Sequence, residues 1–289
     1  MRIVEVERFR EMRHAVITLR RRRDGNMRVV LVPMAHVAHP EFYRQVTRQL
    51  EGCDVILTEG IGKGGPRWVR LITIAYELMP YVHRSVILQP RNVDLLPPGA
   101  RQIWADVSGR EIASDLRAGL GRRGLAYYLV LGAAVGLVGA VVGPSLFIIR
   151  GVNAVLPARI PPYGYHTPRE RTRNSDPASI DIRRNRRLFA ELDRLDDAHR
   201  GEELTVGVVY GANHIAEVFL HLFVRRGYRL AAEPVWLTPI SVHGSAASRL
   251  LSFLLRRLRR QGSQRNRGPA NAVRSPGPIS SADPSQAEG

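Results

Sequence analysis

The chain has 289 residues, of which 44% are apolar, and it carries a formal net charge of +17. This size and composition are typical of one large domain or two small ones with a hydrophobic core. Cys53 is the only cysteine, so the sequence excludes disulfides within the chain and thiolate metal cages, which fits a reducing compartment. No apolar run typical of a secretory signal opens the sequence.

The basic residues are arginines apart from Lys63. Such an excess of positive charge permits contact with nucleic acid or with an anionic membrane surface. No recognition-helix, zinc-finger or RNP-like pattern accompanies it, so nucleic-acid binding is not favoured.

Strands and helices alternate in the first half of the chain. An Asp-Gly turn separates two β-prone runs near the start, which predicts a hairpin. Apolar residues spaced by four predict the helix that follows, and Gly52 is typical of its end. In chain order, we expect a hairpin over residues 14–23 and 27–36, a helix over 39–52, a strand over 54–58, a helix over 66–79, and a strand and helix over 100–120.

Residues 124–149 form an uncharged segment between Arg123 and Arg150. Its length and polarity qualify it as a transmembrane helix, and it contains Gly-x-x-x-Gly steps that let helices approach closely. A single crossing would place the two halves of the chain on opposite sides of a membrane. Since the site described below needs both halves, we expect this segment to be a buried or membrane-dipping helical element instead.

The second half predicts another strand–helix–strand unit. In chain order, we expect a helix from Ser179, a strand over 204–211 followed by a helix, a strand over 229–240, a basic amphipathic helix over 245–261, and a disordered tail over 262–289. The basic helix is typical either of an ordinary packed helix or of one that lies on an anionic membrane. The fold expected is α/β, with a mixed central sheet flanked by helices and a central apolar helical insertion.

Two histidines follow apolar strands in the same way. His36 ends "VPMAH" and precedes Glu59, which follows the next strand; His214 ends "YGANH" and precedes Glu233. The ends of parallel strands collect ligands in α/β sheets, so His36 and His214 are expected to reach one site. Imidazoles and carboxylates there could bind a cation or perform acid–base chemistry, although histidines at strand ends also bond to backbone.

Neighbouring residues offer further candidates of the same chemical types. His39 lies three residues after His36 and could be another metal ligand, or it could be solvated. Glu217, three residues after His214 on a helix, could orient that imidazole, or it could be an exposed carboxylate.

The segments "VPMAHVAHPEF", "DVILTEG" and "VVYGANHIAEV" resemble the TraB/PrgY/GumN and Tiki superfamily over residues 14–240. The resemblance assigns Gly211 and His214 to the second Gly-x-x-His motif of that family and Glu59 to its glutamate. His36 matches the first motif, in which Pro33 replaces the preferred glycine.

Further residues match the family less closely. "RRN" is similar to its helical Arg-Asn/Asp motif, giving Arg184 and Asn185, and Asp106 is a looser match after the third strand.

The resemblance implies a metal-dependent hydrolase that acts on a peptide, a related amide or another small molecule. His36, His214 and Glu59 would bind a divalent cation (Mn, Zn or Co), and Glu59, Arg184 and Asn185 would serve catalysis. The alternative is a non-catalytic regulator, associated with the membrane and otherwise cytoplasmic, that binds a peptide or small ligand in the same site. A third reading, an anion or nucleic-acid binder driven by arginine, would show affinity that falls steeply with salt.

Overall fold

The computed structural model describes residues 3–7, 11–21, 27–60, 66, 68, 77, 80, 83–90, 92–142 and 178–241. The chain divides into two units, Met1–Ser248 and Arg249–Gly289, and the second lies outside the described residues. The predicted helix over 245–261 and the tail over 262–289 therefore lie outside the described residues. So do most of the predicted helix over 66–79 and all of residues 143–177.

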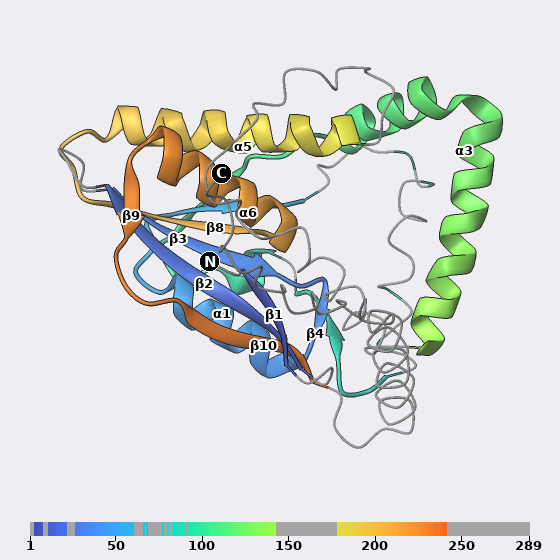
Figure 1. Cartoon of the computed structure of the whole chain (residues 1–289), viewed down its shortest axis with the longest axis horizontal. Helices are drawn as coiled ribbons and strands as arrows, with labels where there is room; N and C mark the ends of the chain where they lie inside the picture. Colours follow the sequence, from blue (N-terminus) through green and yellow to red (C-terminus); the bar gives the residue numbers. More distant parts are fainter. Residues whose placement is uncertain are drawn as a thin grey trace, which may run out of the picture. The chain divides into compact units, whose positions relative to one another are not determined.

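Eight of the described strands form a mixed sheet with helices on both faces (Figure 1), as expected for the α/β class, and the other two pair with each other in a separate small sheet. The strands are β1 (Val4–Glu7), β2 (Glu11–Arg21), β3 (Met27–Met34), β4 (Val37–Ala38), β5 (Val55–Thr58), β6 (Ile87–Leu88), β7 (Arg101–Trp104), β8 (Leu204–Gly211), β9 (Tyr228–Leu230) and β10 (Val235–Ser241). The α-helices are α1 (Pro40–Leu50), α3 (Gly109–Val142), α5 (Ala178–Ala198) and α6 (Ala212–Leu220), and two short segments are a 3₁₀-helix, η2 (Asn92–Leu95), and a π-helix, η3 (His221–Arg225).

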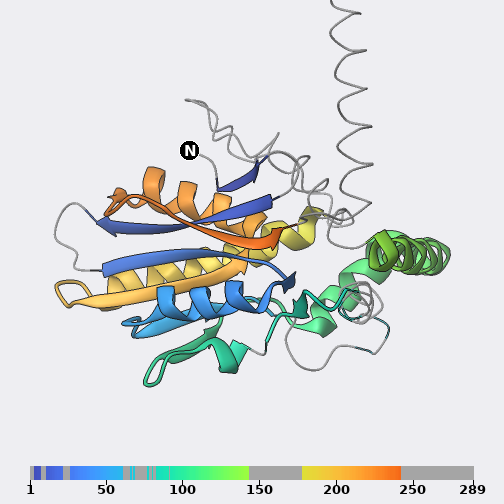
Figure 2. The same ribbon diagram turned by 90° about the horizontal axis from the view of Figure 1, so that it is seen from below.

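The sheet order is β1-β2-β3-β8-β5-β7, and Figure 2 shows these strands side by side. The antiparallel part contains the predicted hairpin, in which Ile17 of β2 pairs with Leu31 of β3, and β1, β9 and β10 also pair antiparallel with β2. From β3 onwards, β8, β5 and β7 are all parallel to one another. These parallel strands bring their carboxyl ends to one edge of the sheet.

Each face of the sheet has its own apolar core. On one face, α1 buries Phe42, Val46 and Leu50, which are the residues whose spacing predicted the helix. On the other face, α5 and α6 pack against the sheet, and α5 buries a stripe at helical spacing: Leu188, Leu192 and Leu195. This stripe fixes α5 across the parallel strands.

The repeat of strand, histidine, helix, strand and glutamate seen in the sequence does not extend to its second glutamate, Glu233. The predicted strand over 229–240 is two strands, β9 and β10, which both pair with β2 rather than with β8. Glu233 is exposed in the bend between them, so it does not join the edge where the parallel strands end.

Helix α3 begins where the sequence predicts a helix and continues to Val142, with a kink at Gly121. It therefore enters the uncharged segment 124–149, whose residues 143–149 and several side chains before them lie outside the described part. Within the described part, no helix combines the length and hydrophobicity that crossing a bilayer requires. The apolar helical insertion thus stays a prediction.

Candidate functional site

The carboxyl ends of the four parallel strands supply the polar residues of one site. Glu59 follows β5, Asp106 follows β7, and His36 follows β3. Gly211 ends β8 in register with Met34 of β3, so the helix that carries His214 begins beside the segment that carries His36. The parallel register that the sequence predicts for this edge is therefore the reason these side chains gather.

Glu59 is held by two donors from different elements. Its Oε2 accepts the Gly211 N–H at 2.5 Å, and its Oε1 accepts Nη2 of Arg184 at 2.5 Å. Burial alone would raise the pKa of this carboxyl, but Arg184, His214, His36 and the Gly211 N–H together hold the pKa of Glu59 below its usual range. Glu59 is therefore an anion at neutral pH.

Gly211 is required at its position by space rather than by backbone conformation. A Cβ there would lie 3.2 Å from Oε2 of Glu59, closer than most side-chain contacts allow. The glycine of "GANH" thus lets the backbone N–H approach the carboxylate.

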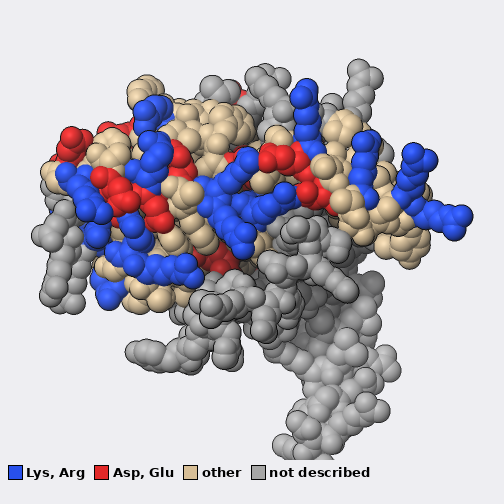
Figure 3. Space-filling view, turned by 90° about the horizontal axis from the view of Figure 1, so that it is seen from above, with Lys and Arg blue, Asp and Glu red and all other residues tan. Residues whose placement is uncertain are grey.

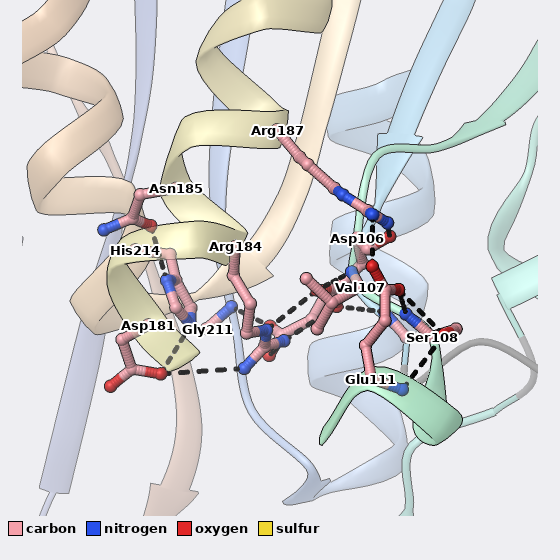
Figure 4. Close-up of polar contacts among 12 residues, drawn as sticks. Asp106, Val107, Ser108, Glu111, Asp181, Arg184, Asn185, Arg187, Gly211 and His214 are labelled. Atoms are coloured by element: carbon pink, nitrogen blue, oxygen red, sulfur yellow. Dashed lines mark hydrogen bonds and ion pairs between the residues drawn. The ribbon is translucent and has the colours of Figure 1, made fainter. Parts of the chain in front are cut away.

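Arg184 joins the two carboxylates at the edge (Figure 4). Its Nε donates to Oδ1 of Asp106 at 2.8 Å and its Nη2 donates to Oδ2 at 2.8 Å, in a bidentate pair. Backbone N–H groups of Gly60 and Val107 also donate to Asp106. Burial would lower the pKa of the guanidinium, but the two carboxylates raise it, so Arg184 stays charged.

His214 is held in one orientation by Asn185. Its Nδ1 lies 2.7 Å from Oδ1 of Asn185, and because an amide oxygen can only accept, Nδ1 carries the proton. The Nε2 atom therefore holds a lone pair. Burial lowers the pKa of His214, with Arg184 acting in the same direction and Glu59 opposing, which keeps the imidazole neutral at neutral pH. Asn185 therefore orients this imidazole, and the orienting role that the sequence offered for Glu217 stays a prediction.

Tyr210 packs edge-on to His214, with ring centroids 6.0 Å apart. Its hydroxyl is buried and has no hydrogen-bond partner among the described residues. Burial raises the pKa of this phenol, and the charges of Asp106 and Glu59 raise it further. Tyr210 therefore stays neutral and packs beside the imidazole of His214.

His36 and His39, which lie three residues apart after β3, have different surroundings. His36 is exposed, and its Nδ1 lies 3.2 Å from Oε1 of Gln89. His36 nevertheless helps to lower the pKa of Glu59, which places it near that carboxylate. His39 instead bonds to backbone, through Nδ1 to the Ser85 carbonyl at 2.7 Å and through Nε2 to the Ser241 N–H at 3.1 Å. His39 joins three segments of the fold and is not oriented as a metal ligand.

Glu59, one of the predicted metal ligands, is engaged by other groups in the structure described. Both oxygens of Glu59 already accept N–H donors, one of them from a guanidinium that would repel a cation. In the described part of the chain, no group of three or more His, Cys, Asp or Glu side chains has the geometry to hold a metal ion. As arranged, the residues do not fit a cation at Glu59, and the metal stays a prediction.

We compared the chain with family models, curated proteins and solved structures. None of them matches. The likeness to the TraB/PrgY/GumN superfamily therefore rests on the motifs alone.

Sequence reasoning missed one polar residue of the site. Asp181 lies in the first turn of α5, and its Oδ1 is 4.0 Å from Nη1 of Arg184 and 4.0 Å from Nε2 of His214. Its spacing from Arg184 and Asn185 continues the face of α5 that buries leucines further along the helix. That helical spacing is the signal that could have identified it.

Proposed function

We propose that the protein is a hydrolase of the TraB-like type that acts on a peptide or related amide, with His214 as its general base. One observation carries the proposal: a buried, neutral imidazole whose Nδ1 proton is fixed by Asn185 and whose Nε2 lone pair lies beside a charged arginine. A base that is unprotonated at the working pH and has a fixed tautomer is suited to take a proton from water.

The other residues have separate roles in this reaction. Nε2 of His214 takes a proton from water, and the imidazolium returns it to the leaving amine. The Nη1 group of Arg184 is used by neither Glu59 nor Asp106, and it would donate to the carbonyl oxygen as negative charge develops there. The two carboxylates hold the guanidinium in place, so they act as positioning residues.

A divalent cation (Mn, Zn or Co) is implied by the family resemblance alone, and none of these steps passes through it. Metal analysis of the purified full chain tests that expectation. A stoichiometric metal that is lost together with His36 or His214 would show that the ligands converge in solution.

Replacing His214 by glutamine is expected to lower turnover by about 10²- to 10⁴-fold, because the base is lost. Replacing Asn185 by alanine should lower it by about 10- to 100-fold, because the tautomer is no longer fixed. The measurement is cleavage of a pool of internally quenched fluorogenic peptides by the full chain. His199→Gln, at the far end of the α5 region, is the matched control and should leave the rate unchanged.

The same experiment separates the enzyme from a non-catalytic regulator. A wild-type protein that binds peptides from the pool without cleaving any of them would contradict the hydrolase and favour the regulator. Hydrolysis that survives in His214→Gln would contradict the assigned base.

Nucleic-acid binding is less favoured by the charge distribution. Figure 3 shows that basic side chains alternate with acidic ones over the face that carries α5. Two of the ion pairs there are Arg194 with Glu191 and Arg200 with Asp197. An electrostatic footprint for a phosphate backbone is normally an uninterrupted basic stripe.

We also propose that α3 contacts an anionic membrane surface. Large apolar side chains are exposed along it, including Tyr127, Val130 and Leu137, and two exposed arginines, Arg122 and Arg123, precede them. Apolar residues beside arginine are typical of helices that bind anionic lipid.

The expected result is flotation of the full chain with phosphatidylcholine vesicles that contain phosphatidylglycerol. The double variant Val130→Glu/Leu137→Glu should not float, because two charges would enter the bilayer. Val224→Glu, which replaces a similarly exposed valine outside α3, is the control. Equal flotation of all three proteins would contradict the assignment to α3.

A further inference from the structure

Asp181 stands between solvent and the two polar groups at the centre of the site. Its side chain is 66% exposed, whereas those of Arg184 and His214 are 13% and 9% exposed. One oxygen, Oδ1, faces both groups at 4.0 Å (Figure 4). The three residues thus converge on one small space at the N-terminal end of α5.

The 4.0 Å separation is too long for a direct hydrogen bond and suits one bridging water. Nε2 of His214 can only accept, because Nδ1 carries the ring proton, and Oδ1 of Asp181 can only accept as well. A water between them must donate both of its protons. Its oxygen lone pairs are then directed away from both acceptors, and donation to two acceptors makes that oxygen more nucleophilic.

We propose that Asp181 is a further catalytic residue, which together with His214 binds and orients the attacking water. This inference rests on the hydrolase proposed above. The water oxygen forms a bond to the carbonyl carbon while one of its protons moves to Nε2 of His214. The carbon–nitrogen bond then breaks, and the amine leaves with the proton from His214. The second proton of the water stays on the new hydroxyl, so the products are a carboxylic acid and an amine, which become a carboxylate and an ammonium group in water. Asp181 neither gains nor loses a proton in these steps.

A purely structural role for Asp181 is a poor fit to its contacts. Arg184 is already held through Nε and Nη2 by Asp106 and Glu59, at distances much shorter than 4.0 Å. An exposed acid–arginine pair on a helix contributes little to stability. Removal of the Asp181 charge should therefore leave the thermal unfolding midpoint unchanged.

The test is the variant Asp181→Asn in the full chain, assayed with the single peptide that the wild-type protein cleaves fastest. We expect kcat to fall by about 10²-fold while KM stays within about 3-fold of the wild-type value, because the charge acts on water rather than on peptide binding. Asp181→Glu should recover most of the rate. Asp197→Asn is the matched control, since Asp197 also lies on α5 and pairs with an arginine three residues later in the chain, as Asp181 does.

The outcomes separate this inference from the hydrolase itself. If Asp181→Asn cleaves the peptide at the wild-type rate while His214→Gln does not, Asp181 has no catalytic role and the hydrolase stands. A raised KM with unchanged kcat also overturns the inference, because Asp181 would then bind peptide. If the wild-type protein cleaves no peptide, both proposals are overturned together.

Discussion

Replacing Arg184 by methionine is expected to lower the free energy of unfolding by about 3–5 kcal/mol at pH 7. The guanidinium lies between Glu59 and Asp106, whose side chains are only 15% and 1% exposed. Its removal leaves two largely buried anions side by side without a counter-ion. Backbone N–H groups still donate to both carboxylates, so the loss is reduced but not abolished. The measurement is urea unfolding of the full chain.

The pH dependence gives this prediction a second, independent signature. In the wild-type protein the pKa of Glu59 is lowered, so its contribution to stability is present above its unfolded pKa and is lost as pH falls through the folded value. Without Arg184, burial raises the pKa of that carboxyl, so proton uptake favours the folded state. The deficit of Arg184→Met should therefore shrink between pH 7 and pH 5.

Arg194→Met is the matched control for Arg184→Met. Arg194 lies on the same helix and pairs with Glu191 at 2.5 Å, but its side chain is 55% exposed. Its loss should cost less than about 1 kcal/mol. Equal effects of the two variants would show that the Arg184 cluster is no more stabilising than a surface ion pair.

The sheet and the edge that carries the site could be predicted from the sequence. Apolar runs that end in a polar residue, such as "DVILTE" and "VVYGANH", are typical of buried parallel strands, and they are β5 and β8. Once those strands are parallel, their carboxyl ends must share an edge. Glu59, Asp106 and Gly211 therefore gather there without any further assumption.

The pairing of side chains within the site could not be predicted in the same way. Which atoms Arg184 and Asn185 meet depends on where α5 crosses the sheet, and that is set by tertiary packing of its buried leucines. Sequence spacing left open whether Glu217 orients His214, and it gave no sign that Asn185 of α5 would meet Nδ1 of that imidazole. Asp181 was missed for the same reason, because its role depends on a residue of another helix.

Acidification is expected to destabilise the fold through His14, by about 3 kcal/mol between pH 7 and pH 4. His14 lies in β2, is 4% exposed, and its Nδ1 lies 2.8 Å from the Pro33 carbonyl, to which it donates. Burial lowers the pKa of His14 from 6.5 to about 4, and the bond to Pro33 opposes this only in part. The folded state thus binds fewer protons than the unfolded state. Stability is complete above about pH 6.5 and falls as pH approaches 4, at about 1.4 kcal/mol per unit of pKa difference.

The variant His14→Gln isolates this contribution, because an amide can still donate to Pro33 but does not titrate. At pH 7 we expect His14→Gln to be less stable than wild type by about 1 kcal/mol, through imperfect packing beside Phe42. At pH 4 the order should reverse, and urea unfolding at several pH values measures the crossing. Parallel stability curves would contradict the buried-histidine explanation.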